Sequence, residues 1–161
     1  MRPILLCLSL VGVLAGCQSA SSPEVVHDST SEENGEVILR ANSSGFNTPE
    51  RFVVRNGSQW ASVWQTAFAL QTPVPPRPAV DFATEMVVVA ALGARPSGGY
   101  GITIDDLVAE GGGLTVFVTA TSPGRTCFTT QAFTQPVEMV RVRAVPGPVS
   151  FHERSRTHDC D

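Results

Sequence analysis

An unbroken apolar run near the middle of the chain is the feature that most constrains its fold. From Glu85 to Gly93 the sequence reads EMVVVAALG, which has the length of a strand and is apolar from its second residue onward. A strand with one face in water alternates apolar and polar residues, whereas a strand covered on both faces does not. The run therefore predicts a central strand that is buried on both sides.

Other segments have the pattern of half-buried strands. Residues 114–120 alternate cleanly, so that their even-numbered members share one apolar side. The remaining predicted strands span residues 36–41, 51–55, 100–108, 137–143 and 149–151. With one helix between the second and third of all these strands, the chain is predicted to be α+β, a mainly antiparallel β-sheet with one amphipathic helix packed on it.

That helix is predicted to follow the turn at residues 56–58. Apolar residues recur at helical spacing from Trp60 to Phe68, and Ser58 is a suitable N-cap. Both Trp60 and Trp64 fall on one face, so we expect the helix to pack across the sheet. The alternative interpretation of this face is an aromatic platform for a ligand.

The start of the chain has the pattern of an export signal. Arg2 precedes a short apolar run, which is below the roughly 18 residues that a membrane-spanning helix needs. Leu14-Ala15-Gly16-Cys17 resembles the lipobox of bacterial lipoproteins, in which the cysteine is acylated before cleavage. We expect residues 1–16 to be a signal peptide and Cys17 to carry lipid; an ordinary secretory signal with an incidental cysteine is the alternative.

Composition divides the rest of the chain into two parts. Residues 17–36 are rich in Ser and acidic residues and contain no basic residue, which predicts a disordered tether. Residues 37–161 are long enough for a single globular domain and contain equal numbers of arginine and acidic residues. This near-neutral charge argues against a nucleic-acid partner. The chain has no lysine, which excludes chemistry that needs a lysine amine.

Two cysteines remain once Cys7 is removed with the signal and Cys17 is acylated. Because an envelope protein matures in an oxidising compartment, Cys127 and Cys160 are expected to form a disulfide. The alternative is a pair of free thiols. The bridge would attach the C-terminal segment to a long loop that begins near Thr121.

No residue pattern predicts an active site. Ser97 does not lie in a G-x-S-x-G elbow, and His152 and His158 lack the spacing of a helical metal motif. Asp105-Asp106 fits a strand-end turn better than a pair of catalytic carboxylates. We therefore expect a protein that is not an enzyme and has no metal or cofactor.

The turn Arg95-Pro96-Ser97-Gly98-Gly99-Tyr100 is the candidate partner-binding loop. Its two glycines allow positive φ and close approach of another backbone, while Arg95 and Tyr100 belong to the residue types enriched at binding hot spots. The alternative is an ordinary tight turn, with Tyr100 packed inward.

A family resemblance rests on this turn and its flanks. The run from Val87 to Ile104 resembles the PrcB C-terminal domain family, whose usual pattern is a hydrophobic strand, then G-x-[KR]-P-[ST]-G-G-Y, then an alternating strand. The resemblance extends over about residues 50–145 and includes the Trp-bearing helix, Asp81-Phe82 and the Thr-rich segment 129–136. The family is named for a lipoprotein subunit of a bacterial surface protease complex.

The resemblance implies membership of an envelope assembly rather than a reaction. We expect a lipid-anchored interaction module, on the outer membrane with a periplasmic or surface face, that associates with or stabilises a protease or other complex. A protease inhibitor is the first alternative, since the turns at 95–100 and 111–113 and the loop 122–135 faintly resemble the three loops of chagasin-type inhibitors, without their N-P-T-T-G motif. An envelope hydrolase using Ser97 is the second.

Overall fold

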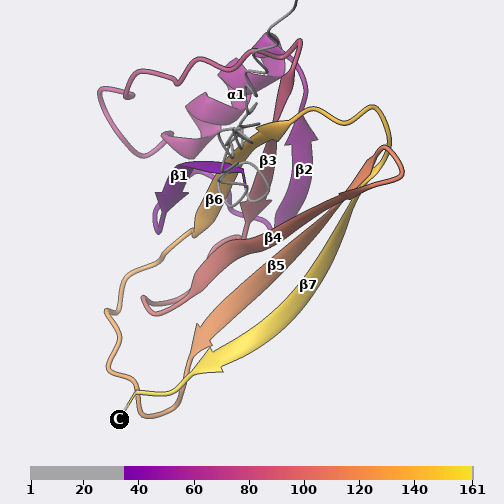
Figure 1. Cartoon of the computed structure of the whole chain (residues 1–161). Helices are drawn as coiled ribbons and strands as arrows, with labels where there is room; N and C mark the ends of the chain where they lie inside the picture. The colour runs from indigo at the N-terminus through magenta and orange to yellow at the C-terminus, as the bar shows by residue number, and fades with distance from the viewer. Residues whose placement is uncertain (1–34, 161) are drawn as a thin grey trace, which may run out of the picture.

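The computed structural model describes residues 35–160. The expected signal peptide, Cys17 and nearly all of the expected tether lie outside these residues. In chain order the elements are β1 (Glu36–Ala41), β2 (Glu50–Val54), α1 (Gly57–Ala67), β3 (Glu85–Ala91), β4 (Gly101–Glu110), β5 (Gly113–Pro123), β6 (Val137–Arg143) and β7 (Val149–His158) (Figure 1).

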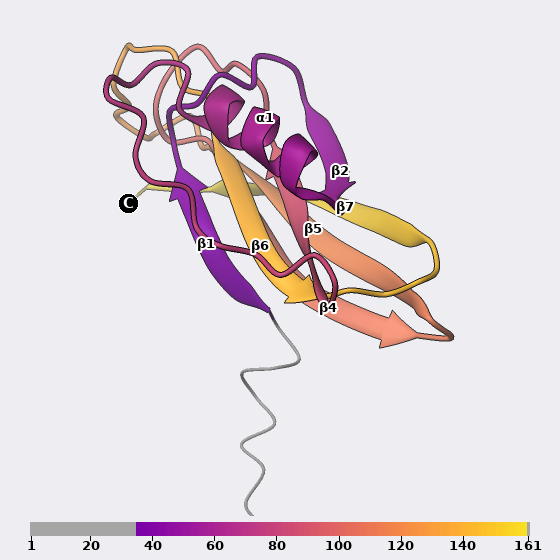
Figure 2. The ribbon, with the colours of Figure 1, turned by 90° about the horizontal axis from the view of Figure 1, so that it is seen from above.

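The strands form two sheets. The first has the order β1-β6-β3-β2 with antiparallel neighbours throughout, and the second has the order β4-β5-β7. Helix α1 covers one face of the first sheet, and the second sheet lies on the other side of it (Figure 2). The predicted α+β class is confirmed, with the strands divided between two layers.

Strand β3 is buried on both faces, as the unbroken apolar run predicts. The side chains of Val87, Val89 and Ala91 pack in the core beneath α1. Those of Met86 and Val88 pack in the second core, between the sheets. Each residue from Met86 to Ala91 has no exposed surface, so successive side chains supply the two cores in turn.

Helix α1 packs as predicted but begins with a different cap. Asn56, rather than Ser58, is the N-cap, because its side chain accepts a hydrogen bond from the backbone N–H of Gln59 at 2.9 Å. Trp60 and Trp64 are buried, and their indole N–H groups donate to carbonyls of the proline-rich connector after the helix. The tryptophan face is therefore part of the core and not an open platform.

Strand β7 is longer than predicted and pairs in parallel with β5. The residues after Phe151 are polar and exposed, so the sequence pattern did not predict that they are extended. The backbone pairs with β5 without a break, from Val149↔Leu114 to His158↔Pro123. This pairing brings the C-terminus to the same end of the molecule as the end of β5 (Figure 1).

A buried carboxylate joins the two sheets. Glu138 of β6 has no exposed surface; its Oε1 accepts from Nε of Arg40 at 2.8 Å and its Oε2 from the backbone N–H of Ile104 at 2.5 Å. Ile104 lies at a register irregularity in β4. A buried charge is tolerated only when it is paired and hydrogen-bonded, and both conditions are met here.

Candidate binding site at the loop end

The turn at residues 95–100 is paired along its length with the long loop before β6. The backbone N–H of Arg95 donates to the carbonyl of Thr134 at 2.8 Å, and the N–H of Thr134 donates back at 3.0 Å. The N–H of Gly98 donates to the carbonyl of Thr130 at 2.9 Å. We call this part of the molecule, made of residues 95–100, 124–136 and Cys160, the loop end.

Both glycines of the turn are explained by close packing. A Cβ atom on Gly98 would lie 2.5 Å from Oγ1 of Thr130. Gly99 has φ +85°, and a Cβ there would lie 2.9 Å from Cβ of Pro123. Only glycine accommodates both the backbone angle and the neighbouring side chain at position 99. The structural explanation of the glycines therefore holds, whether or not the turn also binds a partner.

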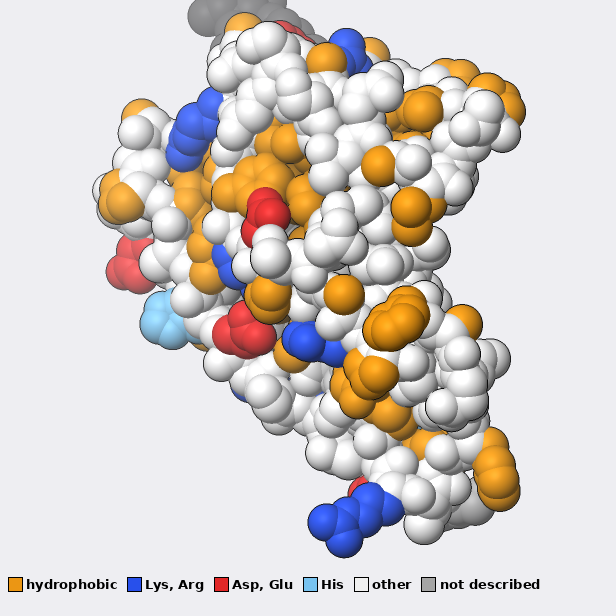
Figure 3. Space-filling view, turned by 180° about the vertical axis from the view of Figure 1, so that it is seen from behind, with side chains coloured by type: hydrophobic (Ala, Val, Ile, Leu, Met, Phe, Trp, Pro, Cys, Tyr) orange, Lys and Arg blue, Asp and Glu red, His pale blue; other side chains and the backbone are white. Residues whose placement is uncertain are grey.

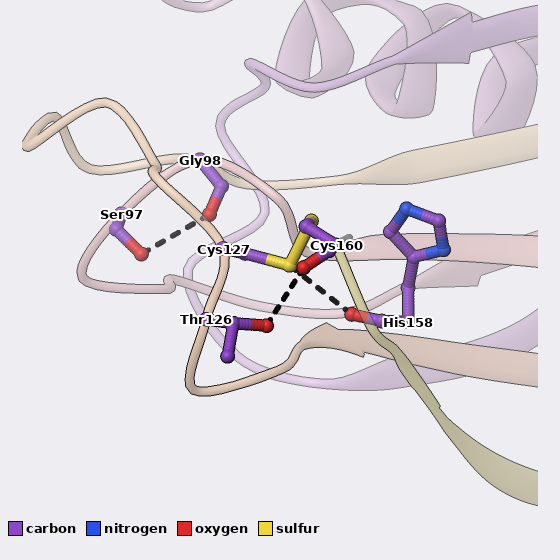
Figure 4. The surroundings of a disulfide bond; sticks show 6 residues. All are labelled: Ser97, Gly98, Thr126, Cys127, His158 and Cys160. Atoms are coloured by element: carbon purple, nitrogen blue, oxygen red, sulfur yellow. Dashed lines mark hydrogen bonds between the residues drawn. A yellow bond between two sulfur atoms is a disulfide. The ribbon is translucent and has the colours of Figure 1, made fainter.

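A disulfide joins Cys127 to Cys160, as expected from the sequence, across a separation of 33 residues (Figure 4). Its surroundings add three hydrogen bonds. Oγ1 of Thr126 donates to the carbonyl of Cys160 at 2.8 Å, and the N–H of Gly124 donates to the carbonyl of His158, also at 2.8 Å. The N–H of Cys127 donates to the carbonyl of Gly124 at 3.2 Å. The loop is thus attached to the end of β7 as well as to the turn.

A hollow of about 280 Å³ lies between the turn and the ends of β5 and β7; we call it the Arg95 hollow. Arg95, Pro96 and Tyr100 line it from the turn side. From the other side it is lined by Leu92, Ala120, Thr121, Ser122 and Ser155.

The hollow forms where the core between the sheets ends. On β5 the inward side chains are large at Leu114, Val116 and Val118, all buried, and small at Ala120 and Ser122, which are half-buried. Ser155 of β7 pairs with Ala120, so it too replaces a core-filling side chain with a small polar one. The space that larger residues would fill is left open beside the turn.

Arg95 has no ion-pair partner within residues 35–160. Its guanidinium carbon lies 5.9 Å from the centroid of the half-buried Tyr100 ring, within the range of a cation–π contact. The structure therefore brings together the two hot-spot residues that the sequence singled out, on one wall of a hollow.

In two other polar hollows the arginines are already paired with carboxylates. In one, Arg141 forms ion pairs with Glu36 and Glu85, and the hydrogen bond that it donates to Glu36 raises the pKa of Arg141 above its usual value against the opposing effect of burial. In the other, Arg154 Nη2 lies 3.3 Å from Oδ2 of Asp105, and the carboxylate of Glu153 is bound by an arginine of β2.

Ser97, Asp105 and Asp106, which were considered for catalysis, make hydrogen bonds within the fold. The hydroxyl of Ser97 donates to the carbonyl of Gly98 at 3.1 Å, and the ring of His158 lies on the far side of the disulfide (Figure 4). Asp105 accepts from Thr119 beside the irregularity in β4, and Asp106 accepts from the N–H of the next residue. Within the described part of the chain no three His, Cys, Asp or Glu residues are grouped so as to hold a metal ion.

The three loops compared with an inhibitor do not share one end of the molecule. The turn at Gly111–Gly113 closes the β4–β5 hairpin, ten residues along β4 from Gly101. Since a strand rises about 3.3 Å per residue, this turn lies roughly 30 Å from the loop end. Figure 1 shows the two at opposite ends of β4.

Two phenylalanines missed by the sequence analysis are exposed on the loop end. Phe128 is 106% exposed and Phe133 is 77% exposed, whereas most large apolar side chains of this domain are buried. The signal available beforehand was two aromatic residues in an otherwise polar, Thr-rich loop. Apolar side chains also reach the surface on this side of the molecule in the view from behind (Figure 3).

Residues 35–160 contain one helix, of eleven residues. It is not long and apolar enough to cross a membrane.

Comparison with known proteins gives one result. The family model described as PrcB C-terminal matches residues 86–143, which run from β3 to β6 and include the turn and most of the loop end. The match is narrower than the resemblance over 50–145, since α1 and Asp81-Phe82 lie before it. No curated protein and no solved structure matches the chain. Residues 86–143 therefore belong to the PrcB C-terminal family.

Proposed function

We propose that this chain is a non-catalytic, lipid-anchored protein of the cell envelope that binds a protein partner, a protease or a protease-containing complex, through its loop end. Membership of the PrcB C-terminal family supports an association with a protease complex. The anchor is proposed from Leu14-Ala15-Gly16-Cys17. The partner is proposed to be stabilised or recruited rather than cut.

The observation that carries the proposal is the exposure of Phe128 and Phe133 on a loop that is firmly attached. Aromatic side chains are enriched at the centres of protein interfaces, and apolar side chains this exposed gain the most by burial against a partner. The disulfide and the pairing with the turn hold the loop backbone before binding. Such preorganisation lowers the entropic cost of association.

Capture from crosslinked envelopes tests the interaction. The tagged full-length protein is compared with a Phe128→Ser/Phe133→Ser variant and with Arg95→Ala/Tyr100→Ala, and captured proteins are identified by mass spectrometry. Val108→Ser, a partly exposed apolar residue of β4 near the other end, is the matched control. We expect a protease enriched with wild type and control and lost with the phenylalanine variant.

Three results would change or replace this proposal. Enrichment that survives both loop-end variants would move the interface elsewhere on the domain. Inhibition of a papain-like protease by the purified protein would favour the inhibitor, and hydrolysis lost in Ser97→Ala would favour the envelope enzyme.

The anchor has a separate test. Intact-mass measurement of the native protein is expected to show a mature chain that begins at Cys17 and carries a diacylglycerol. A mature chain without that added mass would contradict lipidation and leave a secreted protein.

A further inference from the structure

We propose that the Arg95 hollow binds a carboxylate group of the partner, from an acidic side chain or a chain terminus. This inference rests on the proposed function, and it adds the chemistry by which the partner is recognised. The argument depends on which groups line the hollow and which are already paired.

The hollow presents hydrogen-bond donors and no carboxylate. Arg95 contributes a guanidinium, and Tyr100, Ser122 and Ser155 contribute hydroxyl groups. Within the described residues none of these three hydroxyls has a protein hydrogen-bond partner, and the guanidinium makes only one long contact, 3.5 Å from Nη1 to the carbonyl of Ala94. A site built this way favours an anionic acceptor.

This arrangement differs from that of two other charged hollows of the domain. The hollows around Arg141 and Arg154 each contain carboxylates, and these form ion pairs with Arg141 and Arg154. At Arg95 the positive charge lies instead over an aromatic ring. The ring holds the guanidinium in place and leaves its donor edge available, so charge complementarity points to a carboxylate supplied from outside.

Size and charge select the kind of anion. A volume of about 280 Å³ is below the roughly 300–1,000 Å³ of pockets that take drug-sized ligands, so it suits one side chain or chain end. Leu92 and Ala120 give an apolar wall for the methylene groups that precede a carboxylate. One planar guanidinium matches a carboxylate in a two-pronged contact, whereas nothing in the lining adds a second cation for a phosphate.

The test uses the full-length chain labelled with nitrogen-15 and follows the Nε–Hε signal of Arg95, which is assigned with an Arg95→Lys variant. The probes are N-acetyl-glutamate methylamide for a side-chain carboxylate and N-acetyl-glycyl-alanine for a chain terminus. N-acetyl-glutamine methylamide and the amide of the dipeptide are the uncharged counterparts. A saturable shift with one or both acids, and none with the uncharged counterparts, is expected.

Variants link the shift to the hollow. Arg95→Ala is expected to weaken binding of the acidic probe by about tenfold or more, read from backbone signals of β5, the loss expected of one hydrogen bond to a charged group. Arg95→Lys keeps the charge but loses the two-pronged geometry, so it is expected to be intermediate. Arg143→Ala, an exposed arginine without an ion pair among the described residues, is the matched control and is expected to bind as wild type.

Three results would overturn the inference: equal shifts with acid and amide, an Arg95→Ala protein that binds as well as wild type, or tighter binding of N-acetyl-phosphoserine methylamide than of either carboxylate. The capture experiment separates this inference from the proposed function. A protease still captured by Arg95→Ala but lost with the phenylalanine variant would uphold the loop-end interface and refute the carboxylate contact. Binding of acidic probes without any captured protein would uphold the hollow and refute the proposed function.

Discussion

Two glycine-rich turns lie at opposite ends of the β4 strand and use glycine for different reasons. At Gly99 a Cβ would meet Pro123 and Thr129 at 2.9 Å and 3.0 Å. At Gly112, which has nearly the same φ (+80° against +85°), the nearest atom to a Cβ would be 3.9 Å away. The turn at Gly112 accepts a hydrogen bond from the N–H of Gly147 at 2.8 Å but leaves room for a Cβ, whereas the turn at Gly99 packs directly against the side chains of a second segment.

This difference shows how the loop end is built. Its turn, its long loop and the C-terminus lie far apart in sequence and are joined by a disulfide and by backbone pairing. The hairpin end has a turn whose ladder is closed by neighbouring residues, Glu110 and Gly113, and which accepts a backbone hydrogen bond from Gly147 but contains no disulfide. Display of exposed side chains in a fixed arrangement needs long-range support of the first kind, and the exposed phenylalanines lie there.

The largest expected effect comes from removing the disulfide. Cys127→Ser with Cys160→Ser opens a loop of 33 residues of separation, and the chain-entropy argument gives a loss of about 3–4 kcal/mol in the free energy of unfolding. Urea unfolding measures it, and amide hydrogen exchange locates it. Faster exchange at the hairpin end as much as at the loop end would break the contrast between the two ends.

The next effect compares Gly99→Ala with Gly112→Ala. Both variants force alanine into positive φ, at a cost of about 1–2 kcal/mol each. Gly99→Ala also overpacks against Pro123, so we expect it to be more destabilising than Gly112→Ala by about 1–2 kcal/mol. Thermal unfolding of the two proteins is the measurement. Equal losses of stability would mean that Pro123 moves aside at no cost in free energy.

A smaller effect is expected for Gly98→Ala against Gly101→Ala. A Cβ on Gly98 would lie 2.5 Å from the Oγ1 atom of Thr130, which can rotate away, whereas Gly101 has nothing within 4 Å. We expect Gly98→Ala to cost about 1 kcal/mol and Gly101→Ala to be close to neutral. A Gly98→Ala protein as stable as Gly101→Ala would show that the turn and loop pack less tightly than their geometry indicates.

The smallest effect on stability is expected for Arg95→Ala. Because the guanidinium has no ion pair within the described residues, its loss should change the free energy of unfolding by less than about 0.5 kcal/mol. Urea unfolding checks this beside Tyr100→Phe, which keeps the ring. A cooperative transition shifted by more than about 1 kcal/mol would make Arg95 a structural residue of the turn.

Much of the fold follows from local patterns. The unbroken run at β3, the alternation of β5 and the helical spacing of Trp60 and Trp64 each predict the burial that the structure has. Local patterns failed in two places. The polar residues after Phe151 are extended because the distant strand β5 pairs with them. The helix cap is a local contact, but Asn56 makes it in place of Ser58, because the side chain of Asn56 reaches the N–H of Gln59.

The candidate site was half predictable. Arg95 and Tyr100 were identified from residue type, and the Cys127–Cys160 bond from compartment and cysteine count. The sequence did not predict that Ser122 and Ser155 lie beside Arg95 and Tyr100, because no local pattern indicates that β5 pairs in parallel with β7. The same is true of Glu138, whose burial depends on the approach of β4.

The sequence by itself determined the helix, most of the strands and where the turn 95–100 lies, because hydrophobic periodicity and turn chemistry act over a few residues. It determined the cysteine pair through compartment and cysteine count. Only the tertiary structure decided that the strands divide into two sheets and that a loop of polar residues displays two phenylalanines. It alone placed Arg95, which has no ion pair among residues 35–160, over a tyrosine beside two serines. These features depend on contacts between residues far apart in the chain, whose energies no local pattern contains.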